Sequence, residues 1–174
     1  VKSITKDVGK PKSDATNEFL SSIKIWDYVI KNIDKIKKRE KYKFNNRNSG
    51  EIIYRPFGLI AFITPWNYPL LTLSERLPFC IAAGCTAIIK PSEYSNNFKK
   101  VLIKIFNSNK ITSSILNVLK NSDQRVGRLL CNDRNISAIS FVGSSKTGKI
   151  ILKQTASTLK KTYLELGGKN AAIG

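Results

Sequence analysis

The alternation of short apolar segments with stretches of helical length, from Phe57 onward, constrains the fold more than any other feature. The apolar segments lack strict polar–apolar alternation, which favours strands that are buried on both faces. Strands that alternate with helices form a parallel sheet covered on both sides. The expected fold class is therefore α/β, a Rossmann-like doubly wound parallel sheet. Its expected strands are Leu59–Thr64, Thr86–Ile89, Ile115–Leu119, Ile136–Phe141 and Tyr163–Leu166.

Helices are expected between these strands, because each intervening stretch is long enough to cross back over the sheet. Their expected spans are Leu70–Ala83, Asn96–Phe106, Gln124–Leu130 and Ser145–Leu159. We assign residues 57–174 to this sheet-forming unit.

An amphipathic helix is expected earlier in the chain, from Ser13 to about Arg39, within a first unit of residues 1–40. Ser13 or Asp14 is the expected cap, and Gly9-Lys10-Pro11 is the expected breaker before it. The helical spacing of apolar residues predicts a buried face made of Phe19, Ile23, Trp26, Ile30 and Ile33. Residues 41–56 follow as a polar stretch rich in Asn, which is typical of a hairpin tip.

The positive charge raises the question of a nucleic-acid partner. The chain has 30 Lys and Arg against 12 Asp and Glu, a formal net charge of +18. The basic residues are mostly Lys, and the densest run, Lys31–Lys43, falls on the solvent side of the first helix and just past its end. A nucleic-acid footprint would concentrate Arg and aromatic residues on one element. We expect no nucleic-acid partner and, without an apolar run of about 18 residues, no membrane partner.

Three cysteines and no histidine limit the chemistry available within the chain. Without His, neither a Cys–His nor a Ser–His pair can form. Cys80 and Cys85 lie in the apolar stretch Leu77–Ile89, and we expect these two and Cys131 to be reduced core residues. This usage predicts an intracellular, cytoplasmic protein with no bound metal.

Four short blocks stand at the ends of expected strands. In a doubly wound sheet, ligands bind at the carboxyl ends of the strands. A lysine and an acid after a strand can bind the vicinal hydroxyls of a ribose, and a Gly-Ser turn before a helix can approach a phosphate. The blocks are Ile63-Thr64-Pro65-Trp66-Asn67, Lys90-Pro91-Ser92-Glu93, Phe141-Val142-Gly143-Ser144 and Leu164-Glu165-Leu166-Gly167-Gly168-Lys169.

In this order and at this spacing, the four blocks resemble the cofactor-binding half of the NAD(P)-dependent aldehyde dehydrogenase superfamily. The resemblance implies that family's NAD-binding fold and the oxidation of a small-molecule aldehyde to a carboxylic acid through a cysteine thiohemiacetal and thioester. It also implies a homo-oligomer as full-length protein, with the 41–56 hairpin as a possible contact. The stretches Ser74–Pro78 and Ala82–Thr86 look closest to members that act on betaine aldehyde and similar amino-aldehydes.

The resemblance also implies roles for individual residues. Asn67 is the implied oxyanion donor, and Glu165 is the implied general base. Because Glu93 would repel a 2′-phosphate, NAD is the expected cofactor, with NADP as the second candidate. The implied cofactor-binding residues are Ile63, Thr64, Pro65, Trp66, Lys90, Ser92, Glu93, Gly127, Phe141, Gly143, Ser144, Leu166 and Gly167.

Two departures from the family pattern bear on this site. Val142 stands where the family usually has Thr, which keeps the β-branched shape without the hydroxyl. The loops around the third strand, Lys110–Ser114 and Asn121–Asp123, lack the family's glycines, and only Gly127 remains nearby. Asp123 is expected near the path of the phosphates, where its charge would weaken the fit on the adenine side.

The ends of the chain predict a fragment. The family's nucleophilic cysteine lies beyond the glutamate of the last block, whereas this chain ends at Gly174, within apolar residues. It begins at Val1 and contains no Met. We therefore expect truncation at both ends, with the nucleophile and the catalytic domain outside the chain. The alternative is a non-catalytic dinucleotide-binding or oligomerisation module of the same descent.

Overall fold

The computed structural model describes residues 1–36, 39–45, 47–109, 114–168 and 171. Its central sheet has the strand order β5-β4-β3-β6-β7, and every neighbouring pair is parallel. The predicted doubly wound sheet is confirmed, and the strand ends differ from prediction by one or two residues. The strands are β3 (Leu59–Ile63), β4 (Thr86–Lys90), β5 (Leu116–Val118), β6 (Ile136–Gly143) and β7 (Lys161–Leu166).

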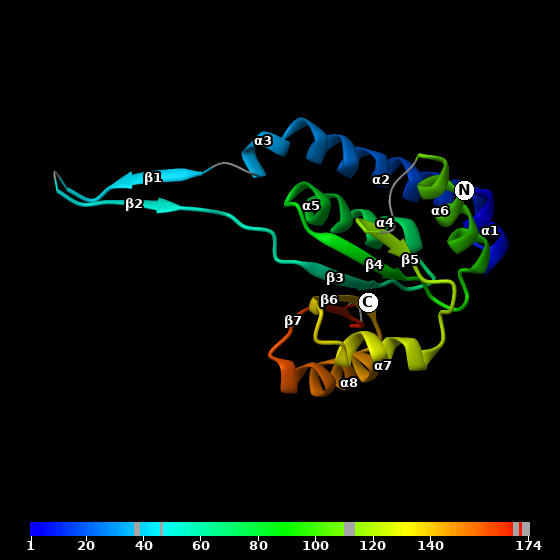
Figure 1. Cartoon of the computed structure of the whole chain (residues 1–174). Helices are drawn as coiled ribbons and strands as arrows, with labels where there is room; N and C mark the ends of the chain where they lie inside the picture. Colours follow the sequence, from blue (N-terminus) through cyan, green and yellow to red (C-terminus); the bar gives the residue numbers. More distant parts are fainter. Residues whose placement is uncertain (37–38, 46, 110–113, 169–170, 172–174) are drawn as a thin grey trace.

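Helices cover both faces of the sheet (Figure 1). On one face lie α1 (Lys2–Val8), α2 (Lys12–Lys31), α4 (Pro69–Ser74), α5 (Leu77–Ala82) and α6 (Asn96–Ser108), with the short α3 (Ile33–Ile36) after α2. On the other face lie α7 (Gln124–Asn132) and α8 (Ser145–Thr155). Each face has its own apolar core: Leu73, Leu77 and Phe98 belong to the first, and Ile139 and Ile151 to the second.

The predicted buried face of the first helix is wrong. Phe19, Ile23 and Ile30 are exposed, whereas the buried residues of α2 include Ala15, Glu18, Ser22 and Val29. Trp26 is common to both stripes, since it packs against the core and donates from Nε1 to Ser74 Oγ at 3.1 Å. The small side chains of Ala15 and Ser22 let α2 lie close to α4 and α5, and the buried Glu18 charge is paired. The spacing of large apolar residues therefore predicted the wrong face of this helix.

The ends of this helix also differ from the prediction. It begins at Lys12 after Pro11, and neither Ser13 nor Asp14 caps it. The predicted breaker is confirmed, because Gly9 ends α1 with a left-handed φ of 70°. That preceding helix was not predicted. The predicted continuation to Arg39 crosses Lys37 and Lys38, which lie outside the described residues, as do 110–113, Lys169 and 172–174.

The predicted helix Leu70–Ala83 is divided into α4 and α5. Pro78 lies in the first turn of α5, where its missing N–H costs nothing, but it could not continue a helix from α4. Arg76 occupies the break as the residue before α5. Similarly, α8 ends at Thr155 and is followed by a 3₁₀ turn, Ala156–Thr158, before Leu159 adopts a φ of 50°.

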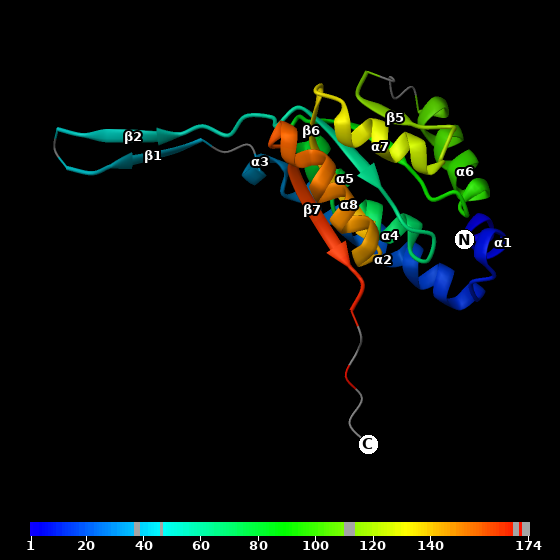
Figure 2. The same ribbon diagram turned by 90° about the horizontal axis from the view of Figure 1, so that it is seen from below.

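The polar region forms the expected hairpin. Strands β1 (Glu40–Lys43) and β2 (Ser49–Ile52) pair antiparallel and project well away from the sheet, as Figure 2 shows. Apolar side chains on and beside it are exposed, with Phe44 at 72%. Across the described part of the chain, no helix is long and apolar enough to cross a bilayer.

Candidate functional site

A cavity of about 480 Å³ opens at the carboxyl ends of β3, β4 and β6. These strands are neighbours in the sheet, and the chain leaves β3 toward one face and β6 toward the other. The cavity therefore lies at the switch point of the doubly wound sheet, where such folds bind ligands. Its volume is within the range of small-molecule sites.

The structure gathers most of the predicted cofactor-binding residues around this cavity. Each of three strand ends contributes a group, and α7 contributes Gly127. The predicted residues that line it are Ile63, Thr64, Pro65, Trp66, Lys90, Ser92, Glu93, Gly127, Phe141, Gly143 and Ser144. Val142, the family departure, lines it as well.

Leu166 and Gly167 do not line the cavity. Leu166 instead lies under α8, where a Cβ placed on Gly148 would come within 2.5 Å of its Cδ2 atom. The absence of a side chain at Gly148 thus allows α8 to approach the end of β7 closely. Gly167 donates from its backbone N–H to the Gly143 carbonyl at 3.2 Å, which ties the residue after β7 to the cavity rim.

Lys90 and Glu93 lie on one side of the cavity. Lys90 is only 7% exposed, and this burial lowers the pKa of its ammonium, while the nearby Glu93 and Asp123 carboxylates act in the opposite direction. Glu93 is exposed, so its carboxylate is available at the rim. Together they offer a donor and an acceptor from one strand end.

The hydroxyl of Thr64 is a buried polar group without a partner. Its Oγ1 atom makes no hydrogen bond within the described residues, although its backbone N–H donates to the Lys90 carbonyl at 3.2 Å. A buried hydroxyl without a partner is unfavourable, and Thr64 lines the cavity. It is therefore suited to a polar ligand group.

The N-terminus of α8 borders the opposite side. Ser144 caps this helix, and its Oγ accepts from the Thr147 N–H at 3.2 Å. Gly143 makes room for an aromatic ring, because a Cβ at that position would lie 2.5 Å from Phe141 Cζ. The positive end of the α8 helix dipole and the nearby Lys146 favour an anion here.

Apart from Gly127, the contributions of α7 and α8 to the cavity were not predicted from the sequence. Arg128 and Cys131 on α7 line the cavity, and so does a stripe of α8 at helical spacing. The helical spacing of Thr147, Ile150, Ile151 and Gln154 after the Gly-Ser turn could have indicated this face, because such spacing places side chains on one side of a helix. The missed residues are Gln124, Arg128, Cys131, Lys146, Thr147, Ile150, Ile151 and Gln154.

Asp123 has a structural role that the sequence did not reveal. It is the N-cap of α7, and its Oδ1 accepts from the Val126 N–H at 3.0 Å. This backbone hydrogen bond lowers the pKa of the carboxyl. Asp123 is not among the residues that line the cavity, although its charge acts on Lys90.

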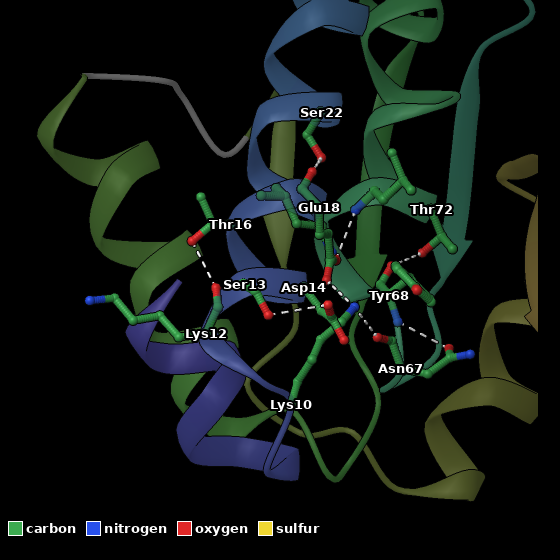
Figure 3. Close-up of polar contacts among 12 residues, drawn as sticks. Lys10, Lys12, Ser13, Asp14, Thr16, Glu18, Ser22, Asn67, Tyr68 and Thr72 are labelled. Carbon is green, nitrogen blue, oxygen red and sulfur yellow. Dashed lines mark hydrogen bonds and ion pairs between the residues drawn. The ribbon is translucent and has the colours of Figure 1, made fainter.

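The two predicted catalytic residues lie outside the cavity. Asn67 is exposed after β3, and its Oδ1 accepts from the Tyr68 N–H at 3.0 Å, while its carbonyl accepts from Lys10 Nζ at 2.9 Å (Figure 3). Glu165 lies on β7, with its side chain 67% exposed and Oε1 2.9 Å from Arg76 Nη2.

The three cysteines are buried, as predicted, and none of them forms a disulfide within the described residues. Burial raises the pKa of Cys80 to about 12, with a smaller contribution from Cys85. Burial also raises the pKa of Cys131 at the cavity wall. The Cys80 and Cys131 thiols are therefore poor nucleophiles near neutral pH. No cluster of potential metal ligands is found among the residues that the structure describes.

Comparison with known proteins identifies relatives of the whole chain. The model of the aldehyde dehydrogenase family matches residues 1–173. Mitochondrial succinate-semialdehyde dehydrogenase of Mus musculus is 34% identical over 170 residues, covering 96% of this chain and 32% of that protein. The NADP(+) succinate-semialdehyde dehydrogenase 1 of Schizosaccharomyces pombe is 34% identical over 166 residues, covering 95% and 33%.

A solved structure agrees with this result. Betaine aldehyde dehydrogenase of Staphylococcus aureus in complex with NAD+ superposes with a TM-score of 0.88 at 28% identity, covering 96% of this chain and 33% of that one. The chain thus spans about a third of the length of the relatives that it matches.

Proposed function

We propose that this chain, which belongs to the aldehyde dehydrogenase family, is the cofactor-binding part of an enzyme that oxidises an aldehyde to a carboxylic acid with a nicotinamide dinucleotide. The observation that carries this proposal is the cavity at the ends of β3, β4 and β6, where a buried lysine, an acid and a helix N-terminus converge.

The lining residues fit the chemical groups of a dinucleotide. Lys90 can donate to ribose hydroxyls and Glu93 can accept from them. The N-terminus of α8 and the Lys146 charge suit the pyrophosphate. The Thr64 hydroxyl, which has no hydrogen-bond partner among the described residues, offers a further polar contact. When bound, the nicotinamide would accept the hydride that leaves the aldehyde carbon.

We favour NAD over NADP as the cofactor. The Glu93 carboxylate would repel a 2′-phosphate at the ribose edge that it is suited to bind. The buried Lys90 beside it could offset part of this repulsion. NADP therefore remains the second candidate, in keeping with the NADP(+) named for the Schizosaccharomyces pombe relative.

Two residues outside the cavity are proposed to act on the substrate. Asn67 would donate from Nδ2 to the aldehyde oxygen as negative charge develops there. Glu165 would take a proton from the water that hydrolyses the thioester. Both lie at the carboxyl ends of strands in the same sheet, after β3 and on β7 respectively.

The nucleophile is proposed to be a cysteine outside this sequence. The described thiols are buried, and burial raises the pKa of Cys80 and Cys131, so neither is suited to attack an aldehyde. The chain also covers only about a third of its relatives. We therefore regard it as part of a longer enzyme.

The β1–β2 hairpin is proposed as a contact between subunits. It projects from the sheet and exposes Tyr42, Phe44 and Ile52 to solvent, along with Ile53 and Tyr54 just after it. Exposed apolar side chains on such an arm favour burial against another protein surface. A second copy of the full-length protein would provide that surface.

The experiment that tests the proposed function uses the full-length protein with a panel of aldehydes. NADH formation that requires both NAD+ and an aldehyde would support it. NAD+ binding without turnover on any aldehyde would instead favour a non-catalytic dinucleotide-binding module. Failure to bind either dinucleotide would remove both interpretations.

A further inference from the structure

Glu18 is a buried carboxylate that the proposed chemistry does not use. Its side chain is fully covered, and its Oε2 atom lies 2.7 Å from Lys10 Nζ. Its Oε1 atom accepts from the backbone N–H groups of Leu70 and Leu71, at 2.9 and 3.2 Å (Figure 3). A buried charge requires such partners, since losing its hydration is unfavourable.

Through these bonds Glu18 fixes the start of α4, the helix that follows Asn67. Tyr68 is the N-cap of α4 and provides no side-chain hydrogen bond to the first turn. The N–H groups at a helix start have no partner within the helix. Glu18 supplies two of these contacts from α2, far away in the sequence.

Lys10 fixes the residues immediately before that helix. Its Nζ donates to the Asn67 carbonyl at 2.9 Å and lies 3.3 Å from the centroid of the Tyr68 ring. Its side chain is only 10% exposed. One ammonium group therefore contacts Asn67, Tyr68 and Glu18 at once.

The oxygen end of the Asn67 side-chain amide accepts a hydrogen bond from the next residue. Because Oδ1 accepts from the Tyr68 N–H, the Nδ2 group is turned away from Lys10 and Glu18, as Figure 3 shows. The orientation of this donor depends on the backbone of residues 67 and 68. That backbone is the part that Lys10 and Glu18 hold.

We propose that Lys10 and Glu18 form a positioning pair for Asn67. The inference rests on the proposed function, in which Nδ2 of Asn67 stabilises the substrate oxygen. Lys10 holds the Asn67 carbonyl, Glu18 holds the first turn of α4, and the ion pair joins the two. Such a pair matters because a displacement of about 1 Å at a reacting group can lower a rate by about 10².

The test measures turnover in the full-length enzyme for Glu18→Gln, Lys10→Met and the double variant. We expect kcat to fall by about 10 to 10², less than or equal to the effect of removing an oxyanion donor. The dissociation constant for NAD+ should stay within about twofold of wild type, because neither residue lines the cavity. Asp14→Asn, an exposed carboxylate on the same helix, is the matched control and should leave kcat unchanged.

A double-mutant cycle distinguishes positioning from a general effect on the fold. If Glu18 acts through Asn67, adding Glu18→Gln to Asn67→Ala should change kcat by less than about twofold, although each substitution alone lowers it. A purely structural role would give effects that multiply. If Glu18→Gln alone does not fold, the variant that combines Glu18→Gln with Lys10→Met replaces it in the cycle with Asn67→Ala. This combination leaves neither charge of the ion pair buried without its partner.

The results that would contradict the proposed function differ from those that would contradict the positioning pair alone. A wild-type enzyme without aldehyde oxidation would remove both. Full activity of Asn67→Ala would remove the role of Asn67 and therefore the positioning pair. A lowered kcat in Asn67→Ala, together with wild-type kcat in both Glu18→Gln and Lys10→Met, would overturn the positioning pair and leave the proposed function intact.

Discussion

The Arg76 guanidinium donates from Nη2 to the Glu165 carboxylate at 2.9 Å. Its Nη1 group also donates to Ser140 Oγ at 3.1 Å and to the Tyr163 carbonyl at 3.2 Å. Arg76 thus connects the break between α4 and α5 with β6 and β7. Because the Glu165 side chain is 67% exposed, the pair orients the carboxylate more than it stabilises the fold.

Replacement of Glu165 by Gln in the full-length enzyme tests the proposed role of Glu165 as general base. The amide keeps the shape and the hydrogen-bonding reach of the side chain but cannot take a proton from water. Steady turnover should fall by about 10² to 10⁴, the usual contribution of a positioned base. A burst of NADH followed by a slow phase should appear in stopped-flow absorbance, because acyl-enzyme accumulates.

The matched control for this substitution is Glu75→Gln. Glu75 is an exposed carboxylate next to Arg76 and has no proposed role in the reaction. Its turnover should equal that of wild type. Unchanged turnover in Glu165→Gln as well would leave Glu165 as a partner of Arg76 only, and the base would have to be another group.

The affinity for NAD+ should depend on pH through Lys90. Burial lowers the pKa of its ammonium below the ordinary value of 10.5. The charged form, which can donate to the ribose, is present below this lowered pKa and is lost as pH rises through it. Calorimetric titrations should therefore show NAD+ binding that weakens as pH rises, with the decline starting below 10.5.

The Lys90→Met variant should bind NAD+ more weakly at neutral pH and should lose this alkaline decline. Lys100→Met, an exposed lysine on α6, should retain it. An alkaline decline of the same size in Lys90→Met would assign the titration to a different group.

A stability prediction concerns Asp7, which caps α6 from α1. Its Oδ1 accepts from the Asn97 N–H and its Oδ2 from the Phe98 N–H, both at 2.8 Å. Asp7→Ala removes both acceptors, so the free energy of unfolding should fall by about 0.5–2 kcal/mol, the usual effect of losing a helix cap. Urea denaturation measures this change. Asp14→Ala, which removes an exposed carboxylate of α2, should change it by less than about 0.5 kcal/mol.

The sheet could be predicted from the sequence because its signals are local. Each apolar segment and each helical stretch between strands is visible in a short window, and the parallel arrangement follows from their alternation. Strand ends were less certain. Lys161 and Thr162 belong to β7 and pair with β6, although neither is apolar enough to be assigned to a strand from the sequence.

The packing of α2 could not be predicted in the same way. Its sequence contains two overlapping stripes, and apolar spacing favoured the one with Phe19 and Ile23, which is exposed. The buried stripe includes Glu18, whose burial depends on Lys10 and on the amides of α4. Such a contact joins residues far apart in the sequence, so no local pattern indicates it. The Asp7 cap on α6 was missed for the same reason.

The candidate site was predictable at the strand ends and, apart from Gly127, not on the helices. Lys90, Glu93 and Ser144 belong to short blocks with recognisable chemistry, and the structure gathers them around one cavity. Arg128 and Gln154 have no such motif, because a helix face becomes a cavity wall only once the helix has packed on the sheet.

The most direct test of the central claim is a calorimetric titration of NAD+ into the full-length protein and its Glu93→Ala variant. We expect NAD+ to bind at one site in the wild type, and we expect the variant to lose about 1–3 kcal/mol of binding free energy, the usual effect of leaving a polar group unpaired. Asp27→Ala, an exposed acid on α2, should bind as wild type does. Equal NAD+ affinity in Glu93→Ala and wild type would contradict the assignment of this cavity as the dinucleotide site.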